Sequence, residues 1–98
     1  MKIFVHPPNR KFLFQPPKKG YLYKYFALPY HGHVYPGELI QFYFDENKQT
    51  LIAEAVLDHI DPPDGTGHGN LKYWYKFFYR WSSFKDCRIH QLPLFPSF

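Results

Sequence analysis

Two adjacent segments form the clearest pattern in the sequence, GELIQFYF at residues 37–44 and TLIAEAVLD at residues 50–58. The first is rich in aromatic and β-branched residues and follows the chain-breaking pair Pro36-Gly37, as strands often do. The second alternates between two sides, with a polar connector at residues 45–49 before it. We therefore predict an antiparallel hairpin. Its second strand would present Leu51, Ala53, Ala55 and Leu57 to the core and Ile52, Glu54, Val56 and Asp58 to the opposite side.

The small side chains of Ala53 and Ala55 need bulky neighbours, and aromatic residues make up 22% of this 98-residue chain. Upstream, the short apolar segments 2–5, 11–15 and 21–28 are separated by proline pairs, which confine strands to short or edge positions. Residues 29–36 and 61–70 are predicted loops. Short strands with proline-rich connectors predict a mainly β fold, a small barrel or sandwich with at most short helices, as a single domain over residues 1–98.

Residues 71–84, LKYWYKFFYRWSSF, are unusually aromatic. Both a strand and a helix fit their periodicity, but aromatic residues suit a pleated surface better, so we predict a strand. Residues 88–92 are predicted as a closing strand. In the segment 71–84 the odd-numbered face is expected to build the core and the even-numbered face to be available for binding. The odd face is Tyr73, Tyr75, Phe77, Tyr79 and Trp81, and the even face is Lys72, Trp74, Lys76, Phe78 and Arg80.

Charge follows the chain in blocks, although the net value is only +4. Residues 1–24 contain six cationic residues and no acidic one, residues 37–64 are acidic, and residues 71–90 are again basic. The blocks could attract one another within the fold. Alternatively, the two basic segments could converge on a polyanion such as nucleic acid, because lysine and arginine supply the sequence-independent part of such affinity.

Conventional catalytic and metal motifs are weak. His31 and His33 lack further ligands nearby in sequence, and the acidic turn at residues 58–64 matches no calcium-loop spacing, so no metal or other cofactor is expected. The glycine-rich segment 65–69 lacks the ending of a nucleotide-binding loop. The lone Cys87 has no paired base, so no catalytic residue is assigned. A single cysteine, no apolar run of transmembrane length and no signal peptide at the start predict a cytoplasmic protein without membrane contact.

The order of these features also resembles a known family. A Pro-Gly-acid turn at residues 36–38 opens a strand, a second strand and an acidic proline-containing loop follow, and a Trp-rich strand ends at Phe84-Lys85. This succession, over about residues 36–88, resembles the PUA-like superfamily, in particular its EVE and ASCH branches. The resemblance implies a mostly antiparallel pseudo-barrel with a cleft that holds a nucleobase, often a modified one, against aromatic side chains.

By position, the resemblance implies that Trp74, Phe78, Arg80, Trp81 and Lys85 belong to the family's Trp-rich segment. It implies that Tyr30 and His31 lie on a loop at the border of the cleft. The charged ASCH-type stretch with a glutamate and an arginine is absent, so hydrolase activity is not expected from the likeness.

Together these features predict a non-enzymatic module that binds nucleic acid or a modified base, with RNA slightly preferred over DNA. Bases would stack on Trp74, Phe78 or Trp81, and phosphates would contact Lys72, Lys76, Arg80 and Lys85. A second hypothesis is a small interaction protein or homodimer that buries its aromatic surface against a partner. A third is an enzyme acting on a nucleotide or another small molecule through His31, His33 or His68.

Overall fold

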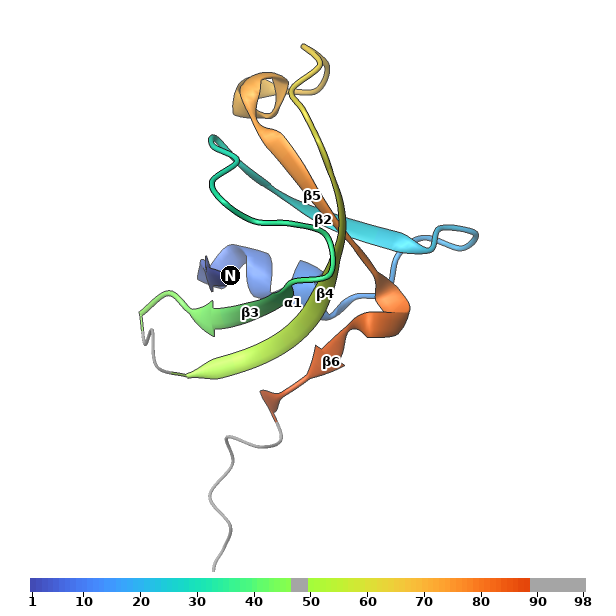
Figure 1. Cartoon of the computed structure of the whole chain (residues 1–98). Coiled ribbons are helices and arrows are strands. Elements are labelled where there is room, and N and C mark those ends of the chain that lie inside the picture. Colours follow the sequence, from blue (N-terminus) through green and yellow to red (C-terminus); the bar gives the residue numbers. More distant parts are fainter. Residues whose placement is uncertain (47–49, 89–98) are drawn as a thin grey trace, which may run out of the picture.

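The computed structural model describes residues 1–46 and 50–88, which form one curled, half-barrel sheet (Figure 1). Its strand order is β1-β3-β4-β5-β2, and β6 pairs with β4. The strands are β1 (Lys2–Val5), β2 (Tyr23–Leu28), β3 (Leu39–Phe44), β4 (Leu51–Asp61), β5 (Tyr75–Arg80) and β6 (Lys85–Asp86). The helical elements are α1 (Pro7–Phe14) and the 3-10 turns η1 (Gly69–Tyr73) and η2 (Trp81–Ser83). The prediction of a mainly β fold with short helices is therefore confirmed.

The long strand β4 joins the two halves of the sheet. Its first half pairs antiparallel with β3, which confirms the predicted hairpin, and its last residues pair antiparallel with β5. Strand β2 then pairs antiparallel with β5 at one edge. At the other edge β1 pairs with β3 in parallel, and the remaining strand pairs are antiparallel, so the sheet is mostly antiparallel as predicted. The curvature of β4 in Figure 1 turns its two halves toward different neighbours.

The turn before β3 explains where the hairpin begins. Gly37 has a φ of 95°, a left-handed conformation that glycine adopts without strain, and Pro36 precedes it, as in type II turns. The amide of Glu38 donates to the carbonyl of Tyr35 (3.1 Å). The amide of Gly37 donates to the carbonyl of Leu57 (2.7 Å), which fastens the turn to β4.

The segment 11–15, expected as one of the short apolar pieces between prolines, instead lies in and after helix α1. Pro7 and Pro8 occupy its first positions, where a missing amide hydrogen costs nothing because no intrahelical acceptor exists there. Leu13 is the residue of the helix that is buried in the core. At the other end, the ammonium of Lys24 donates to the carbonyls of Phe12, Leu13 and Gln15. A basic side chain from β2 thus satisfies carbonyls that the helix leaves open.

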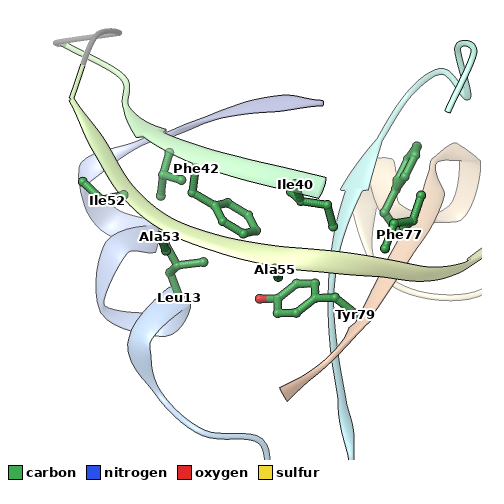
Figure 2. Packing of buried hydrophobic residues seen from close by; sticks show 10 residues of the cluster. Leu13, Ile40, Phe42, Ile52, Ala53, Ala55, Phe77 and Tyr79 are labelled. Atoms are coloured by element: carbon green, nitrogen blue, oxygen red, sulfur yellow. The ribbon is translucent and has the colours of Figure 1, made fainter. Parts of the chain in front are cut away.

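The core is one cluster on the inner side of the curled sheet, and Figure 2 shows its packing. Aromatic rings from distant segments meet there, with Phe26 stacked on Phe77 at 5.2 Å between ring centroids and 4° between planes. Phe42, paired with Ala53, lies 5.8 Å from the ring of Tyr79. Bulky neighbours therefore surround the two alanines as expected. The buried members are Val5, Leu13, Ile40, Phe42, Ile52, Ala53, Ala55, Leu57, Phe77 and Tyr79.

The predicted orientation of β4 was wrong at its beginning. Ile52, assigned to the outward side, is fully buried, and Leu51, assigned to the core, is half-buried. The cause is an irregularity in the pairing, since Phe42 pairs with Ala53 but Tyr43 pairs with Leu51, which leaves Ile52 as an extra residue. A bulge of this kind breaks the strict alternation of sides. Beyond it, Ala53, Ala55 and Leu57 are buried as predicted.

The aromatic segment 71–84 is a strand only over residues 75–80 and is flanked by the turns η1 and η2. Within β5 the predicted division of faces is confirmed, because Phe77 and Tyr79 are buried whereas Arg80 is exposed. Tyr73 lies in η1 and is exposed, contrary to its expected place in the core. The predicted closing strand at residues 88–92 lies outside the described residues except for Arg88. Among the described residues, no helix is long and apolar enough to cross a membrane.

Candidate nucleic-acid interface

Four aromatic side chains meet on the outer side of the sheet, opposite the core. They are Tyr23 and Tyr25 of β2, Phe78 of β5 and His59 of β4, and we call them the aromatic face. Strand pairing brings them together, since Tyr25 is the register partner of Phe78 and Phe78 that of His59. The face therefore spans three adjacent strands.

The rings touch one another as a continuous set. His59 lies parallel to Phe78, with centroids 4.6 Å apart and 8° between planes. Tyr25 is tilted against Phe78 at 5.2 Å, and Tyr23 meets His59 edge-on at 5.4 Å. Tyr25 nevertheless keeps 46% of its surface exposed. Such a platform offers π surface to a planar ligand without requiring a particular base.

Two cations of β5 lie over the tyrosine rings. The ammonium of Lys76 is 5.8 Å from the centroid of Tyr25, and the guanidinium of Arg80 is 5.4 Å from that of Tyr23. Cations in this position are attracted by the electron-rich ring face. Because Lys76, Phe78 and Arg80 alternate with the core residues of β5, the strand presents an aromatic ring between two positive charges.

Carboxylates balance much of this charge. Asp58 accepts a hydrogen bond from Nδ1 of His59 (2.7 Å) and lies 3.6 Å from Nε of Arg80. The pKa of the Asp58 carboxyl lies below its usual range, mainly because of the hydrogen bond from His59, with a further contribution from the nearby Arg80. Asp61 is the register partner of Lys76. This surface therefore offers a ligand mainly aromatic rings for stacking, and little net positive charge.

A small cleft of about 260 Å³ lies near the aromatic face, since Arg80 both lines the cleft and lies over the ring of Tyr23. Trp81 lines the cleft and also packs against the core, where its ring stacks on Phe84 with 4.4 Å between the centroids. The ammonium of Lys24 lies 5.1 Å from the centroid of the same Trp81 ring. Tyr21 and Leu22 are both largely exposed at its rim. The cleft is lined by Tyr21, Leu22, Arg80, Trp81 and Ser82.

Of the nine residues that the sequence suggested for binding, Phe78 belongs to the aromatic face, and Lys76 and Arg80 lie over its two tyrosine rings. Trp81 lines only the adjoining cleft, while Trp74 is half-buried just before β5 and Lys72 is exposed on η1. The other three lie elsewhere in the fold. Lys85 is on β6 beside the first half of β4, Tyr30 is exposed on the loop before β3, and His31 packs edge-on against Tyr75 at 5.6 Å.

Sequence reasoning missed Tyr23, Tyr25 and His59. The alternation of tyrosines at positions 21, 23 and 25 could have indicated a tyrosine-lined strand face. No local signal could have placed His59, because the pairing of β4 with β5 shifts between Leu57 and His59. Strict alternation from Leu57 would have turned His59 into the core.

The other chemical candidates lie in unreactive settings. Asp64 accepts hydrogen bonds from the amide (2.9 Å) and the hydroxyl (2.6 Å) of Thr66, and these lower the pKa of its carboxyl. Cys87 is buried, and burial raises the pKa of its thiol, which disfavours the reactive thiolate. Within residues 1–46 and 50–88, no three histidine, cysteine or acidic side chains are grouped as a metal site would require.

No protein-family model, curated protein or solved structure matches the chain. The resemblance to the PUA-like superfamily therefore stays a prediction, and the functional argument depends on the geometry of the surface.

Proposed function

We propose that the aromatic face binds single-stranded nucleic acid by stacking bases on its rings. The supporting observation is the continuous contact of Tyr25, Phe78 and His59 across three strands, with Lys76 and Arg80 above the neighbouring tyrosine rings. Base stacking on an aromatic side chain contributes about 1–3 kcal/mol per base and tolerates any sequence. A duplex offers no free base faces, so single strands are the expected ligands.

RNA is the preferred form in this proposal. The two tyrosines contribute phenol hydroxyls, which can donate to or accept from a ribose 2′-hydroxyl, a group that DNA lacks. Lys76 and Arg80 would contact phosphates. Because Asp58 and Asp61 lie beside these cations, we expect a shallow salt dependence, with about two counterions released and a slope of log affinity on log salt near −1.4 for single strands.

Fluorescence anisotropy of a labelled oligoribonucleotide of about ten residues tests the proposal, since comparable sites span roughly 4–16 nucleotides. We expect Tyr25→Ala to weaken binding by about 5- to 150-fold, which corresponds to about 1–3 kcal/mol. Tyr35→Ala is the matched control, because Tyr35 is also an exposed tyrosine (64%) but lies on the loop before β3. Equal affinity of the two variants, or equal binding of the same sequence as a duplex, would contradict the proposal.

A protein-docking role is the second candidate, and a different observation favours it. Leu39 of β3 and Val56 of β4 are register partners, and both remain more than two-fifths exposed on the outer side of the sheet. Paired apolar side chains of this kind suit an interface, including one between two copies of the chain. Sedimentation velocity over a range of concentrations tests the homodimer form. We expect Val56→Lys to abolish any dimer, and a purely monomeric chain at high concentration would exclude this version.

A further inference from the structure

A second cleft, of about 490 Å³, lies away from the aromatic face and shares no residue with it. It is formed where the end of α1 meets the end of β3 and Arg88, which lies two residues after the end of β6. Its volume falls within the usual range for small-molecule sites. The lining side chains are Arg10, Lys11, Phe14, Gln15, Phe44 and Arg88.

Both arginines of the cleft lie over phenylalanine rings. The guanidinium carbon of Arg10 is 4.2 Å from the centroid of Phe44, and that of Arg88 is 3.4 Å from the centroid of Phe14. Stacking of this kind fixes the plane of a guanidinium, which presents its N–H donors in a rigid fork. The cleft therefore combines apolar ring surface with positive groups held in defined positions.

Each arginine is also held by a carboxylate that does not line the cleft. Arg10 pairs with Glu46, and Arg88 donates through Nε (3.1 Å) and Nη2 (2.7 Å) to Asp86. These bonds leave donors unused. Within the described residues, Nη1 of Arg88 has no acceptor, and Nε of Arg10 is shielded from solvent without one. Because Nε of Arg10 is shielded, the unused donor that a ligand can reach is Nη1 of Arg88, whose side chain is about half exposed.

Lys11 adds a third positive group at the cleft. Its ammonium is exposed and has no ion pair among the described residues. Three cations against two carboxylates leave a local excess of one positive charge. An acceptor with several oxygens could bond to Lys11 and to Nη1 of Arg88 at once.

We propose that this cleft binds a small organic anion, a phosphate or carboxylate attached to a flat apolar group. The anionic oxygens would accept from Lys11 and from Nη1 of Arg88, and Arg10, held by Glu46 and Phe44, would add its positive charge at the cleft. The flat group would pack against Phe14 and Phe44. Guanidinium groups bind both oxyanions through the same forked geometry, so the two anions are compared directly in the experiment.

The probes are 1-naphthyl phosphate and 1-naphthoate. Neutral 1-naphthol, which has only the flat group, and inorganic phosphate, which has only the anion, are the half-ligands used as controls. Binding is followed through the amide chemical shifts of the full chain. We expect at least one anionic probe to bind several-fold more tightly than either half-ligand and to shift the amides of Arg10, Lys11, Phe44 and Arg88. The tighter of the two anionic probes identifies the preferred oxyanion.

Lys11→Gln tests the assignment of the cation, with Lys19→Gln as a control that removes the same charge from an exposed turn. We expect Lys11→Gln to weaken binding about three- to fivefold, as for a solvent-exposed ion pair, and Lys19→Gln to leave it unchanged. Equal losses in both variants would overturn the proposal. Equal binding of 1-naphthol, or shifts confined to the aromatic face around Phe78, would overturn it as well, whatever the outcome for nucleic acid.

Discussion

The imidazole ring of His59 on β4 stacks on the ring of Phe78 on β5, with 4.6 Å between the ring centroids. This position is unexpected because His59 lies two residues after Leu57, which faces the core. Leu57 is buried, so regular alternation would also direct His59 inward. The irregular pairing between Leu57 and His59 turns the imidazole outward and returns Ile60 to the core cluster. A single irregularity in β4 therefore completes the aromatic face and keeps the core filled.

Neighbouring phenylalanines on β5 provide a test that separates stability from binding. Phe77 is 0% exposed, so Phe77→Ala should lower the free energy of unfolding by about 3–5 kcal/mol. Phe78 is half-buried on the outer side, so Phe78→Ala should cost only about 1–2 kcal/mol while it removes a stacking ring. Urea unfolding monitored by circular dichroism measures both, and oligonucleotide binding is then measured for the Phe78 variant. Equal destabilisation by the two variants would contradict the division of faces.

Because of the bulge at Ile52, truncation of Ile52 should destabilise the protein more than truncation of Leu51, whereas strict alternation along β4 predicts the opposite order. Ile52→Ala should destabilise the protein by about 2–5 kcal/mol, because it leaves a cavity at a fully buried site. Leu51→Ala removes a half-buried side chain and should cost about 1 kcal/mol. Thermal and urea unfolding of the two variants side by side check this order. The reverse order would mean that Leu51 faces the core and that the pairing of Tyr43 with Leu51 is incorrect.

Lys24 should contribute to stability through the end of α1. Lys24→Met keeps most of the apolar stem but removes the donor to the carbonyls of Leu13 (3.3 Å) and Gln15 (2.6 Å). Burial lowers the pKa of Lys24, so part of what these bonds contribute is offset by desolvation of the ammonium. We expect a net loss of about 1–3 kcal/mol in the free energy of unfolding.

Lys18→Met is the comparison for this change, since Lys18 is exposed on the turn between α1 and β2. Its effect should stay within about 0.5 kcal/mol. Amide exchange should also show earlier opening of α1 in the Lys24 variant than in the wild type. An unchanged rate of opening would show that Lys24 does not stabilise the end of α1.

Acid should weaken the link between Asp58 and His59. The pKa of Asp58 is lower in the folded protein than the usual value of 3.8, so the carboxylate stabilises the fold above that value. This contribution is lost as the pH falls through the lowered pKa. Asp58→Asn should therefore reduce stability at neutral pH and approach the wild type in acid.

A double-mutant cycle isolates the pair in that experiment. His59→Phe keeps a ring on Phe78 but cannot donate to Asp58, so the cycle of Asp58→Asn with His59→Phe reports their coupling. We expect coupling at neutral pH and none once Asp58 is protonated. Coupling that is independent of pH would show that another interaction joins these positions.

The sequence pattern predicted several parts of the fold correctly, because the alternation of buried and exposed side chains along a strand depends only on neighbouring residues. The hairpin of β3 and β4 follows from Pro36-Gly37 and two β-rich segments. The split of β5 into a core side and an outer side follows from the period of two. These features give Phe77 and Phe78 their different surroundings, and they also placed Lys76 and Arg80 on one side with Phe78.

The sequence alone therefore determined a mainly β chain with an aromatic core and a strand whose opposite sides differ in chemistry. Tertiary structure decided that Tyr23 and Tyr25 lie beside Phe78, because β2 and β5 are far apart in sequence and pair only in the folded sheet. It also decided where β4 departs from alternation, at Ile52 and before His59, because burial of the whole cluster sets the register of each strand. The cleft between Arg10 and Arg88 likewise depends on the end of α1 meeting the end of β3 and Arg88, and no local sequence pattern encodes a contact between such distant segments.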